Sequence, residues 1–162
     1  MTISGNCIYS CSNRNLLLED SRHIAMNGNI FRRHAPMYGT GVRMVRCHDI
    51  VLAGCSIHDE HPEGQPSGAS LLELVDCRRI NVSGCQLTDG VPYGVDAVDC
   101  SDVVLTGCTV QDTRVERKSR HGARFAGSGR GNLIAASSIG AGVKGQLSIE
   151  DTAGVHFEGN SL

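Results

Sequence analysis

The sequence contains few aromatic residues and no tryptophan. Of its 162 residues, 3 are tyrosine and 3 are phenylalanine, so aromatic residues make up only 4% of the chain. A core of this composition cannot be built on large rings, and it must use small and branched side chains in narrow layers. The scarcity of rings also argues against recognition of neutral sugars by aromatic stacking.

Long apolar runs and an excess of positive charge are also lacking. No apolar stretch approaches the roughly 18 residues that a membrane span needs, so no membrane partner is expected. The net charge is −2 with histidine neutral, which argues against a nucleic-acid partner, because proteins that bind nucleic acids are usually basic. The first ten residues lack a basic region followed by an apolar stretch, so no signal peptide is visible.

An internal repeat is the main feature that the sequence does have. Three segments, 47–57, 77–87 and 100–110, align without a gap, and weaker copies follow the same frame. A marker glycine recurs at Gly5, Gly28, Gly54, Gly84, Gly107 and Gly159, with Ala136 once in its place. The shortest spacing, 23 residues, is typical of one bare coil, and the longer spacings add a loop.

Apolar residues stand at fixed positions around the marker glycine, and they alternate with polar residues. The column ten residues before the glycine reads Leu18, Met44, Leu74, Ala97, Ala126 and Ile149. The column four residues before it reads Ile24, Ile50, Ile80, Val103 and Val155, with Asn132 as an interruption. This period-2 pattern predicts three short strands per coil, and stacked coils would form parallel sheets that are stable only as an array.

The sequence therefore predicts an all-β fold: a single-stranded right-handed parallel β-helix (solenoid) of about seven coils. The right hand is inferred from the general preference of parallel crossovers. Residues 1–162 are expected to form a single domain, either a whole β-helix or a piece of a longer one.

Six of the 8 cysteines form two columns in this repeat. The columns are Cys47, Cys77, Cys100 and Cys55, Cys85, Cys108. We favour small buried thiols that fill the core, because the Cβ vectors of stacked cysteines run parallel, which suits a disulfide poorly. No Cys-x-x-Cys pair is present to indicate zinc. Free thiols lean toward a reducing, cytoplasmic compartment.

The residue after each marker glycine is always asparagine, cysteine or serine. These residues are Asn6, Asn29, Cys55, Cys85, Cys108, Ser137 and Asn160. In this respect the chain resembles the pectate-lyase-like right-handed β-helix repeats, in which a stacked asparagine or serine commonly occupies the second turn. The resemblance covers nearly the whole chain and is specific for fold rather than for function.

Insertions between the third strand of one coil and the first strand of the next mark the expected site. They fall at 32–41, 58–68, 88–94 and 111–122, and insertions in a solenoid often cluster on the binding face. The family resemblance implies that these loops and the outer face of the first strand form a polysaccharide groove.

Arg43, Glu73 and Asp96 form the outward column on that first strand, and they are the candidate catalytic residues. A basic residue can abstract the proton next to a sugar acid, and carboxylates can hold a cation that neutralises the acid, which makes calcium the cofactor to test. This chemistry belongs to lyases and epimerases of acidic polysaccharides. The alternative is a surface ladder in which Arg43 pairs with Glu73.

The segment around Asp96 also resembles the alginate epimerase motif Y-G-F-D-P-H-E. It reads Tyr93-Gly94-Val95-Asp96-Ala97-Val98-Asp99. Tyr93, Gly94 and Asp96 match, whereas Val98 stands where the motif has its histidine. The resemblance implies that Tyr93 contacts substrate, and a chance match in a glycine-rich repeat is the alternative.

Two further sets of residues are candidates for contact with substrate. Asp59, Asp89 and Asp112 lie five residues after successive glycines, and stacking would place them about 5 or 10 Å apart, which brackets the separations in glycosidases. Aspartates that shape turns are the alternative. The loop residues Arg114, Arg117, Lys118, Arg120 and His121 would meet a carboxylated sugar, or form an exposed charged loop.

The segment His58-Asp59-Glu60-His61 has metal-ligand residue types, but no third ligand is set by spacing, so no metal site is assigned.

The sequence leaves two functions open. The first is a carbohydrate-related protein that binds or acts on an acidic polysaccharide, as a lyase or epimerase. The second is a non-catalytic binding or assembly module. A homo-oligomer is expected in either case, because uncovered sheet edges and end coils invite association.

Overall fold

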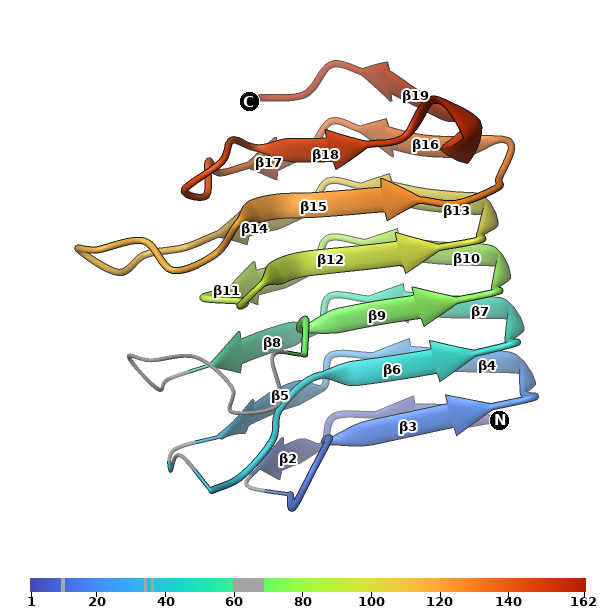
Figure 1. Cartoon of the computed structure of the whole chain (residues 1–162). Helices are drawn as coiled ribbons and strands as arrows, with labels where there is room; N and C mark the ends of the chain where they lie inside the picture. The colour runs from blue at the N-terminus through green and yellow to red at the C-terminus, as the bar shows by residue number, and fades with distance from the viewer. Residues whose placement is uncertain (10, 34, 36, 60–68) are drawn as a thin grey trace.

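The computed structural model describes residues 1–9, 11–33, 35, 37–59 and 69–162. These residues form a right-handed parallel β-helix with three parallel sheets, as the repeat predicted (Figure 1). Each coil adds one strand to sheet A, then one to sheet B, then one to sheet C. The described residues make six full coils and the first strand of a seventh.

Sheet A is built from β1 (Thr2–Ser4), β4 (Arg22–Asn27), β7 (His48–Ala53), β10 (Arg78–Ser83), β13 (Ser101–Thr106), β16 (Asn132–Ala135) and β19 (Val155–Glu158). Sheet B is built from β2 (Cys7–Tyr9), β5 (Ile30–Arg33), β8 (Ser56–Asp59), β11 (Gln86–Thr88), β14 (Thr109–Gln111) and β17 (Ser138–Ile139). Sheet C is built from β3 (Leu16–Glu19), β6 (Val42–Val45), β9 (Leu72–Val75), β12 (Tyr93–Val98), β15 (His121–Ala126) and β18 (Leu147–Ile149).

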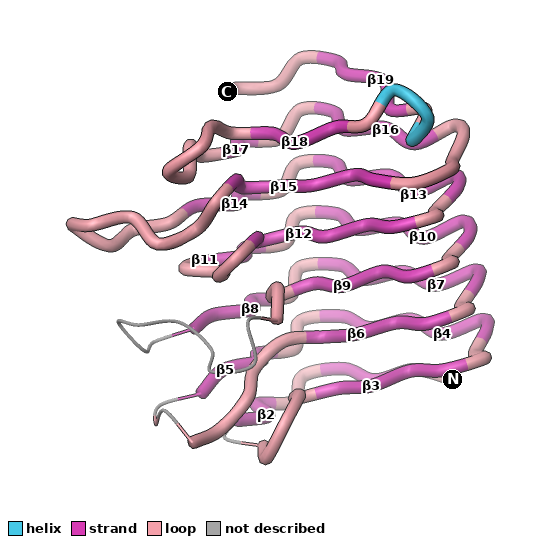
Figure 2. The backbone as a smooth tube through the Cα atoms, in the orientation of Figure 1, coloured by secondary structure: helices cyan, strands magenta, loops and turns pink. Residues whose placement is uncertain are grey.

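The long loops gather at one edge of the stack, where sheet B leads into sheet C (Figure 2). The insertions expected at 88–94 and 111–122 lie at this edge, as do the described residues of 32–41, whereas most of 58–68 lies outside the described residues. The described part of the chain has a single helix, the short 3₁₀ turn η1 (Asp151–Ala153), and no helix long and apolar enough to cross a membrane.

The marker glycines are the first of the two residues that turn the chain from sheet A to sheet B. Their φ angles are positive, for example +60° at Gly28 and +57° at Gly54. Glycine enters this left-handed region without the steric cost that a Cβ brings. Ala136 adopts the same conformation with φ +47°, so the repeat is kept even where its marker residue is not glycine.

A ladder of hydrogen bonds explains the residue type that follows each glycine. Five side chains in this column accept a hydrogen bond from the backbone N–H of the residue at the same position in the coil before. The bonds are Asn6 N to Asn29 Oδ1 at 3.1 Å, Asn29 N to Cys55 Sγ at 3.4 Å, Cys55 N to Cys85 Sγ at 3.4 Å, Cys108 N to Ser137 Oγ at 3.2 Å and Ser137 N to Asn160 Oδ1 at 2.9 Å. All six column cysteines are free and buried, which confirms the prediction of packed thiols.

The inward columns fill the space between the sheets, with one correction. Phe125, not Ala126, pairs with Ala97 and Ile149 in the inward column of sheet C, and it is buried. The glycine-rich stretch 127–131 adds one residue to this coil, so counting ten back from Ala136 misses the register by one.

Asn132 lies in the inward column of sheet A, four residues before the marker position, where the sequence pattern treated it as an interruption of the apolar residues. It is buried, its Oδ1 accepts a hydrogen bond from Val103 N at 2.9 Å, and its Nδ2 donates to Cys100 O and Ala153 O at 2.8 and 2.7 Å. Its amide is therefore fully used by backbone groups of the flanking turns, as a buried polar side chain requires.

Candidate functional site

Four charged side chains follow one another across the outer face of sheet C. Arg43, Glu73, Asp96 and Arg124 are successive register partners on β6, β9, β12 and β15. The structure thus brings the three predicted members of this column together and adds Arg124. We call these four residues the charged column.

Glu73 is held from two sides. Its Oε2 accepts a hydrogen bond from Arg43 Nη1 at 2.7 Å and lies 2.7 Å from Arg14 Nη2. Its Oε1 accepts a hydrogen bond from Ser70 N at 2.9 Å. The Arg43–Glu73 pair is the surface ladder that the sequence left as an alternative.

Asp96 and Arg124 form a two-pronged ion pair. Arg124 donates from Nε to Asp96 Oδ1 at 2.7 Å and from Nη2 to Oδ2 at 3.0 Å. The guanidinium carbon also lies 4.9 Å from the centroid of the Tyr93 ring, within cation–π range. Tyr93 is in turn stacked on His121, its register partner, with 6.1 Å between ring centroids.

We refer to Tyr93, Asp96, His121 and Arg124 as the Tyr93 cluster. Within the part of the chain that is described, His121 Nδ1 is buried and has no hydrogen-bond partner. The next coil thus supplies a histidine beside Tyr93, at the opposite end of the strand from Val98, whose register partner is Ala126. An imidazole, a phenol, a carboxylate and a guanidinium together provide groups for proton transfer and for binding an acid.

The environment of Asp96 raises the pKa of its carboxyl group. Burial makes the largest contribution, since the side chain is only 14% exposed, and the neighbouring Glu73 carboxylate acts in the same direction. The Arg124 guanidinium lowers the pKa but does not cancel these effects. Asp96 therefore takes up a proton more readily than an ordinary aspartate.

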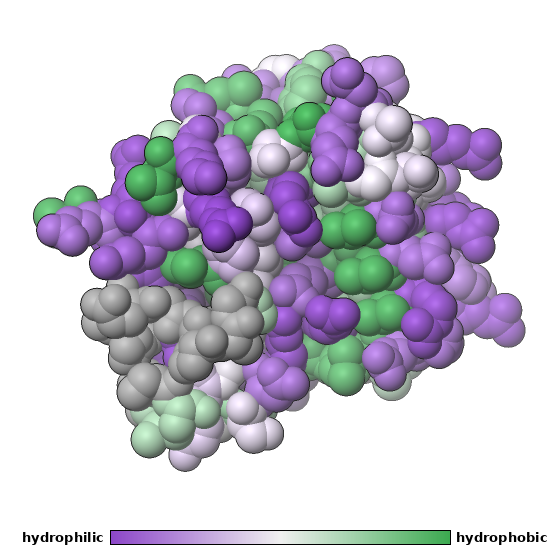
Figure 3. Space-filling view, viewed as in Figure 1, coloured by the Kyte–Doolittle hydropathy of each residue, from purple (hydrophilic) through white to green (hydrophobic). Residues whose placement is uncertain are grey.

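An open depression of about 370 Å³ adjoins the Arg43 end of the charged column. It is lined by Asn13, Arg14, Leu17, Glu19, Arg43, Ala69 and Glu73. Val45, Val75 and Val98 run in register beside the charged column. The outer face of sheet C thus combines charge with an apolar stripe, which Figure 3 shows among hydrophilic side chains.

The predicted acidic column is stacked as expected but serves the fold. Asp59 is buried and makes a two-pronged ion pair with the buried Arg33, at 2.7 and 3.0 Å. The Asp112 carboxylate, 1% exposed, accepts hydrogen bonds from the backbone N–H groups of Lys118 and Ser119 at 2.7 and 2.8 Å. Both carboxylates, which the sequence suggested for contact with substrate, are therefore buried and held by groups of the protein itself.

Asp89, the middle member, organises the same loop edge. It is buried, and its Oδ1 accepts a hydrogen bond from Thr113 N at 2.6 Å. His58 Nε2 lies 3.3 Å from its Oδ2. The turn interpretation therefore describes Asp89 as well, and we leave it out of the proposed site.

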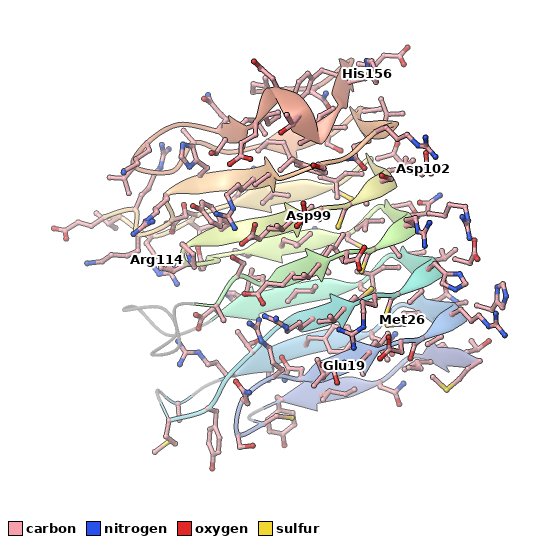
Figure 4. All side chains as sticks on the ribbon, turned by 45° about the vertical axis from the view of Figure 1, so that its right-hand side comes forward. Glu19, Met26, Asp99, Asp102, Arg114 and His156 are labelled. Carbon is pink, nitrogen blue, oxygen red and sulfur yellow. The ribbon has the colours of Figure 1, made fainter. Side chains whose placement is uncertain are left out.

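The basic loop is only partly available to a ligand. The Arg114 side chain is 11% exposed, and it donates to Asp112 Oδ1 at 3.0 Å and to Asp89 O at 2.8 Å. Arg120 is exposed and Lys118 is half-buried. Figure 4 shows Arg114 at the loop edge and Asp102 at the opposite edge of the coil. Arg120 and Lys118 are the loop cations nearest in sequence to the Tyr93 cluster.

No group of three or more histidine, cysteine or acidic residues in the described ranges is arranged to hold a metal ion. Glu60 and His61 of the segment weighed for metal binding lie outside the described residues.

Sequence reasoning missed two arginines of the site. Arg124 was missed because the shifted register put Phe125 in the outward column. Placing Phe125 inward, as the larger apolar residue of the pair Phe125 and Ala126, would have put Arg124 in the outward column. Arg14 lies in the loop between β2 and β3, outside the repeat, so its position carries no signal of the 2.7 Å contact with Glu73.

The stacked sheets define the class of protein: a single-stranded right-handed parallel β-helix. The family model described as "Right handed beta helix region" matches residues 1–162, and the chain belongs to this family. No curated protein matches the chain.

Two solved structures are similar to it. One is the periplasmic alginate epimerase AlgG, with a TM-score of 0.72 and 12% identity over 99% of this chain. The other is a candidate glycosyl hydrolase from Parabacteroides merdae, with a TM-score of 0.59 and 12% identity, covering 95% of this chain and 81% of that one. The chain spans 39% of the epimerase's length. At this identity, the likeness shows the fold alone.

Proposed function

We propose that the protein binds an acidic polysaccharide on the outer face of sheet C and acts on it as a lyase or epimerase. The Tyr93 cluster carries this proposal, because it places a guanidinium beside two groups able to transfer protons. The fold likeness to AlgG and to the candidate glycosyl hydrolase supports a carbohydrate-related function in general.

The chemistry begins with removal of the proton on the carbon next to the sugar carboxylate. Arg124 stabilises the negative charge that develops on the carboxylate, and His121 is the candidate base. Return of a proton from solvent to the opposite face of that carbon completes an epimerisation. Departure of the neighbouring glycosidic oxygen, which takes a proton as its bond to carbon breaks, completes a lyase reaction. Arg43, which is 40% exposed and uses Nη1 to bind Glu73, would offer its remaining N–H groups to a second carboxylate of the same chain.

A titration with defined glycans tests this function. We expect polygalacturonate or alginate to bind and neutral dextran not to bind, with and without calcium. Arg124→Gln should weaken binding about tenfold, which corresponds to about 1.4 kcal/mol, because it removes the cation that pairs with the sugar acid. Chromatography of the sugar products after incubation would detect unsaturated or epimerised units.

Arg78→Gln is the matched control, because it removes the same charge from an exposed position at the start of β10 on sheet A. Its affinity should stay at the wild-type value. Equal losses in the two variants would indicate attraction by overall charge alone, and equal binding of dextran would contradict the proposal.

The outer face of sheet A favours the second function, an assembly module, on a separate observation. Two outward rows on its five central strands are uncharged: Ala25, Val51, Asn81, Val104, Leu133 and Asn27, Ala53, Ser83, Thr106, Ala135. Seven strands about 4.8 Å apart, five residues long on average, give roughly 550 Å² per face. Two such faces would bury about 1,100 Å², just above the roughly 1,000 Å² that a specific interface should clear.

We therefore propose that a second copy of this chain covers sheet A, since two adjacent outward rows without charge across the central strands suit self-association. Light scattering at micromolar concentration should give the mass of two chains. Val51→Lys should shift the mass to one chain, because it puts a charge in the centre of the face. Val115→Lys, at a fully exposed loop position, should leave the dimer intact. A wild-type mass of one chain at every concentration would refute the dimer.

A further inference from the structure

In the free protein, Arg124 is already paired with the carboxylate of Asp96. The proposed function requires the same guanidinium to bind a sugar carboxylate. Its Nε and Nη2 both donate to Asp96, and the Tyr93 ring lies against its guanidinium. The Arg124 side chain is 33% exposed and Asp96 is 14% exposed. A sugar carboxylate must therefore displace Asp96 from this edge or share the guanidinium with it. Either outcome puts a second negative charge against Asp96 and weakens its hold on Arg124.

The groups around Asp96 make that arrangement costly for an ionised carboxylate. Glu73 lies beside it in register on β9, and the buried setting already disfavours charge on Asp96. From β15, Arg124 and the His121 ring face the same cluster, and Tyr93 shares the strand of Asp96. The opposing cations on the other side are Arg43 and Arg14, and both are bound to Glu73.

We propose that binding of an acidic glycan to this face is coupled to uptake of a proton by Asp96. This inference rests on the proposed function and deepens it: Asp96 is a positioning residue that holds Arg124 in the free protein and gives it up, as the neutral acid, to the ligand. The step balances, because one solvent proton neutralises Asp96 as one ligand carboxylate replaces its charge. Neutral sugars cannot make this exchange, so Asp96 also selects for acidic units.

The sign of the pH dependence follows from linkage. Below the pKa that Asp96 has in the free protein, the group is already protonated and binding takes up nothing. Above the higher pKa that it has in the complex, it stays ionised in both states. Between the two values, binding takes up as much as one proton, and affinity falls by as much as tenfold for each unit rise in pH.

Calorimetric titration with an oligogalacturonate, in buffers of different ionisation enthalpy, measures the proton uptake directly. We expect uptake approaching one proton in wild type and none in Asp96→Asn. Asp96→Asn should also bind more tightly than wild type above the transition, with an affinity that no longer depends on pH there. Asp76→Asn, an exposed aspartate outside the cluster, should behave as wild type.

A second measurement needs no ligand. Carbon-13 NMR titration of the Asp96 carboxyl should give a higher pKa in Arg124→Gln and a lower pKa in Glu73→Gln than in wild type. Binding without proton uptake, or with equal uptake in wild type and Asp96→Asn, would overturn the coupling while leaving the proposed function intact. Absence of binding to any acidic glycan would overturn both.

Discussion

Cys85→Asp should unfold the protein, whereas Gln86→Asp, one residue further along, should barely change its stability. Cys85 is buried in the ladder, where its Sγ accepts a hydrogen bond from Cys55 N and donates toward Leu52 O at 3.4 Å. A carboxylate there faces a carbonyl oxygen, cannot donate, and cannot be hydrated. Gln86 points outward from β11.

We expect Cys85→Asp to cost more than about 4 kcal/mol, most of the stability of an average domain. Gln86→Asp should stay within about 0.5 kcal/mol of wild type. Urea unfolding followed by far-ultraviolet circular dichroism measures both. Cys85→Ser, which keeps a small donor and acceptor, should retain the fold. Equal unfolding midpoints for Cys85→Asp and Gln86→Asp would show that inward and outward residues of the repeat have been assigned wrongly.

Arg33→Met should have the second largest effect. Arg33 and Asp59 are both 0% exposed, and removal of the guanidinium leaves a buried carboxylate without its two-pronged partner. Breaking one side of such a pair typically costs about 3–5 kcal/mol. The double variant Arg33→Met/Asp59→Leu should recover much of the loss, because it removes the uncompensated charge.

Arg46→Met provides the matched control for this prediction. Arg46 makes the same kind of fork with Asp20, at 2.7 Å, but the two side chains are 52% and 66% exposed. Water and salt screen such a pair, so its loss should leave the unfolding midpoint close to wild type. Similar destabilisation by Arg33→Met and Arg46→Met would contradict the role assigned to burial.

The repeat predicted the fold because each of its signals has a direct structural cause. Gly54 and its equivalents mark left-handed turns, and parallel stacking places like residues over like, so columns in the sequence become columns in space. The same reasoning placed Arg43, Glu73 and Asp96 in one row. The prediction that Ala126 points inward was wrong, because one added residue in 127–131 shifts the register. Arg124 was therefore left out of the predicted outward row.

The contacts of individual polar groups were beyond the sequence pattern. Spacing indicates that Asp59 and Asp112 belong to one stacked column. It does not indicate that Asp59 forms a buried ion pair with Arg33, or that Asp112 accepts hydrogen bonds from loop N–H groups. Loop contacts such as Arg14 with Glu73 join segments far apart in the chain, and no periodicity encodes them. Columns are therefore predictable from the repeat, whereas the partners that loops supply are not.

The most direct test of the account is a crystal structure of the protein with an oligogalacturonate. We expect sugar units along the outer face of sheet C, with one ligand carboxylate on Arg124 and the ion pair between Arg124 and Asp96 opened or shared. A ligand that leaves the Tyr93 cluster untouched, or that lies on sheet A instead, would contradict it.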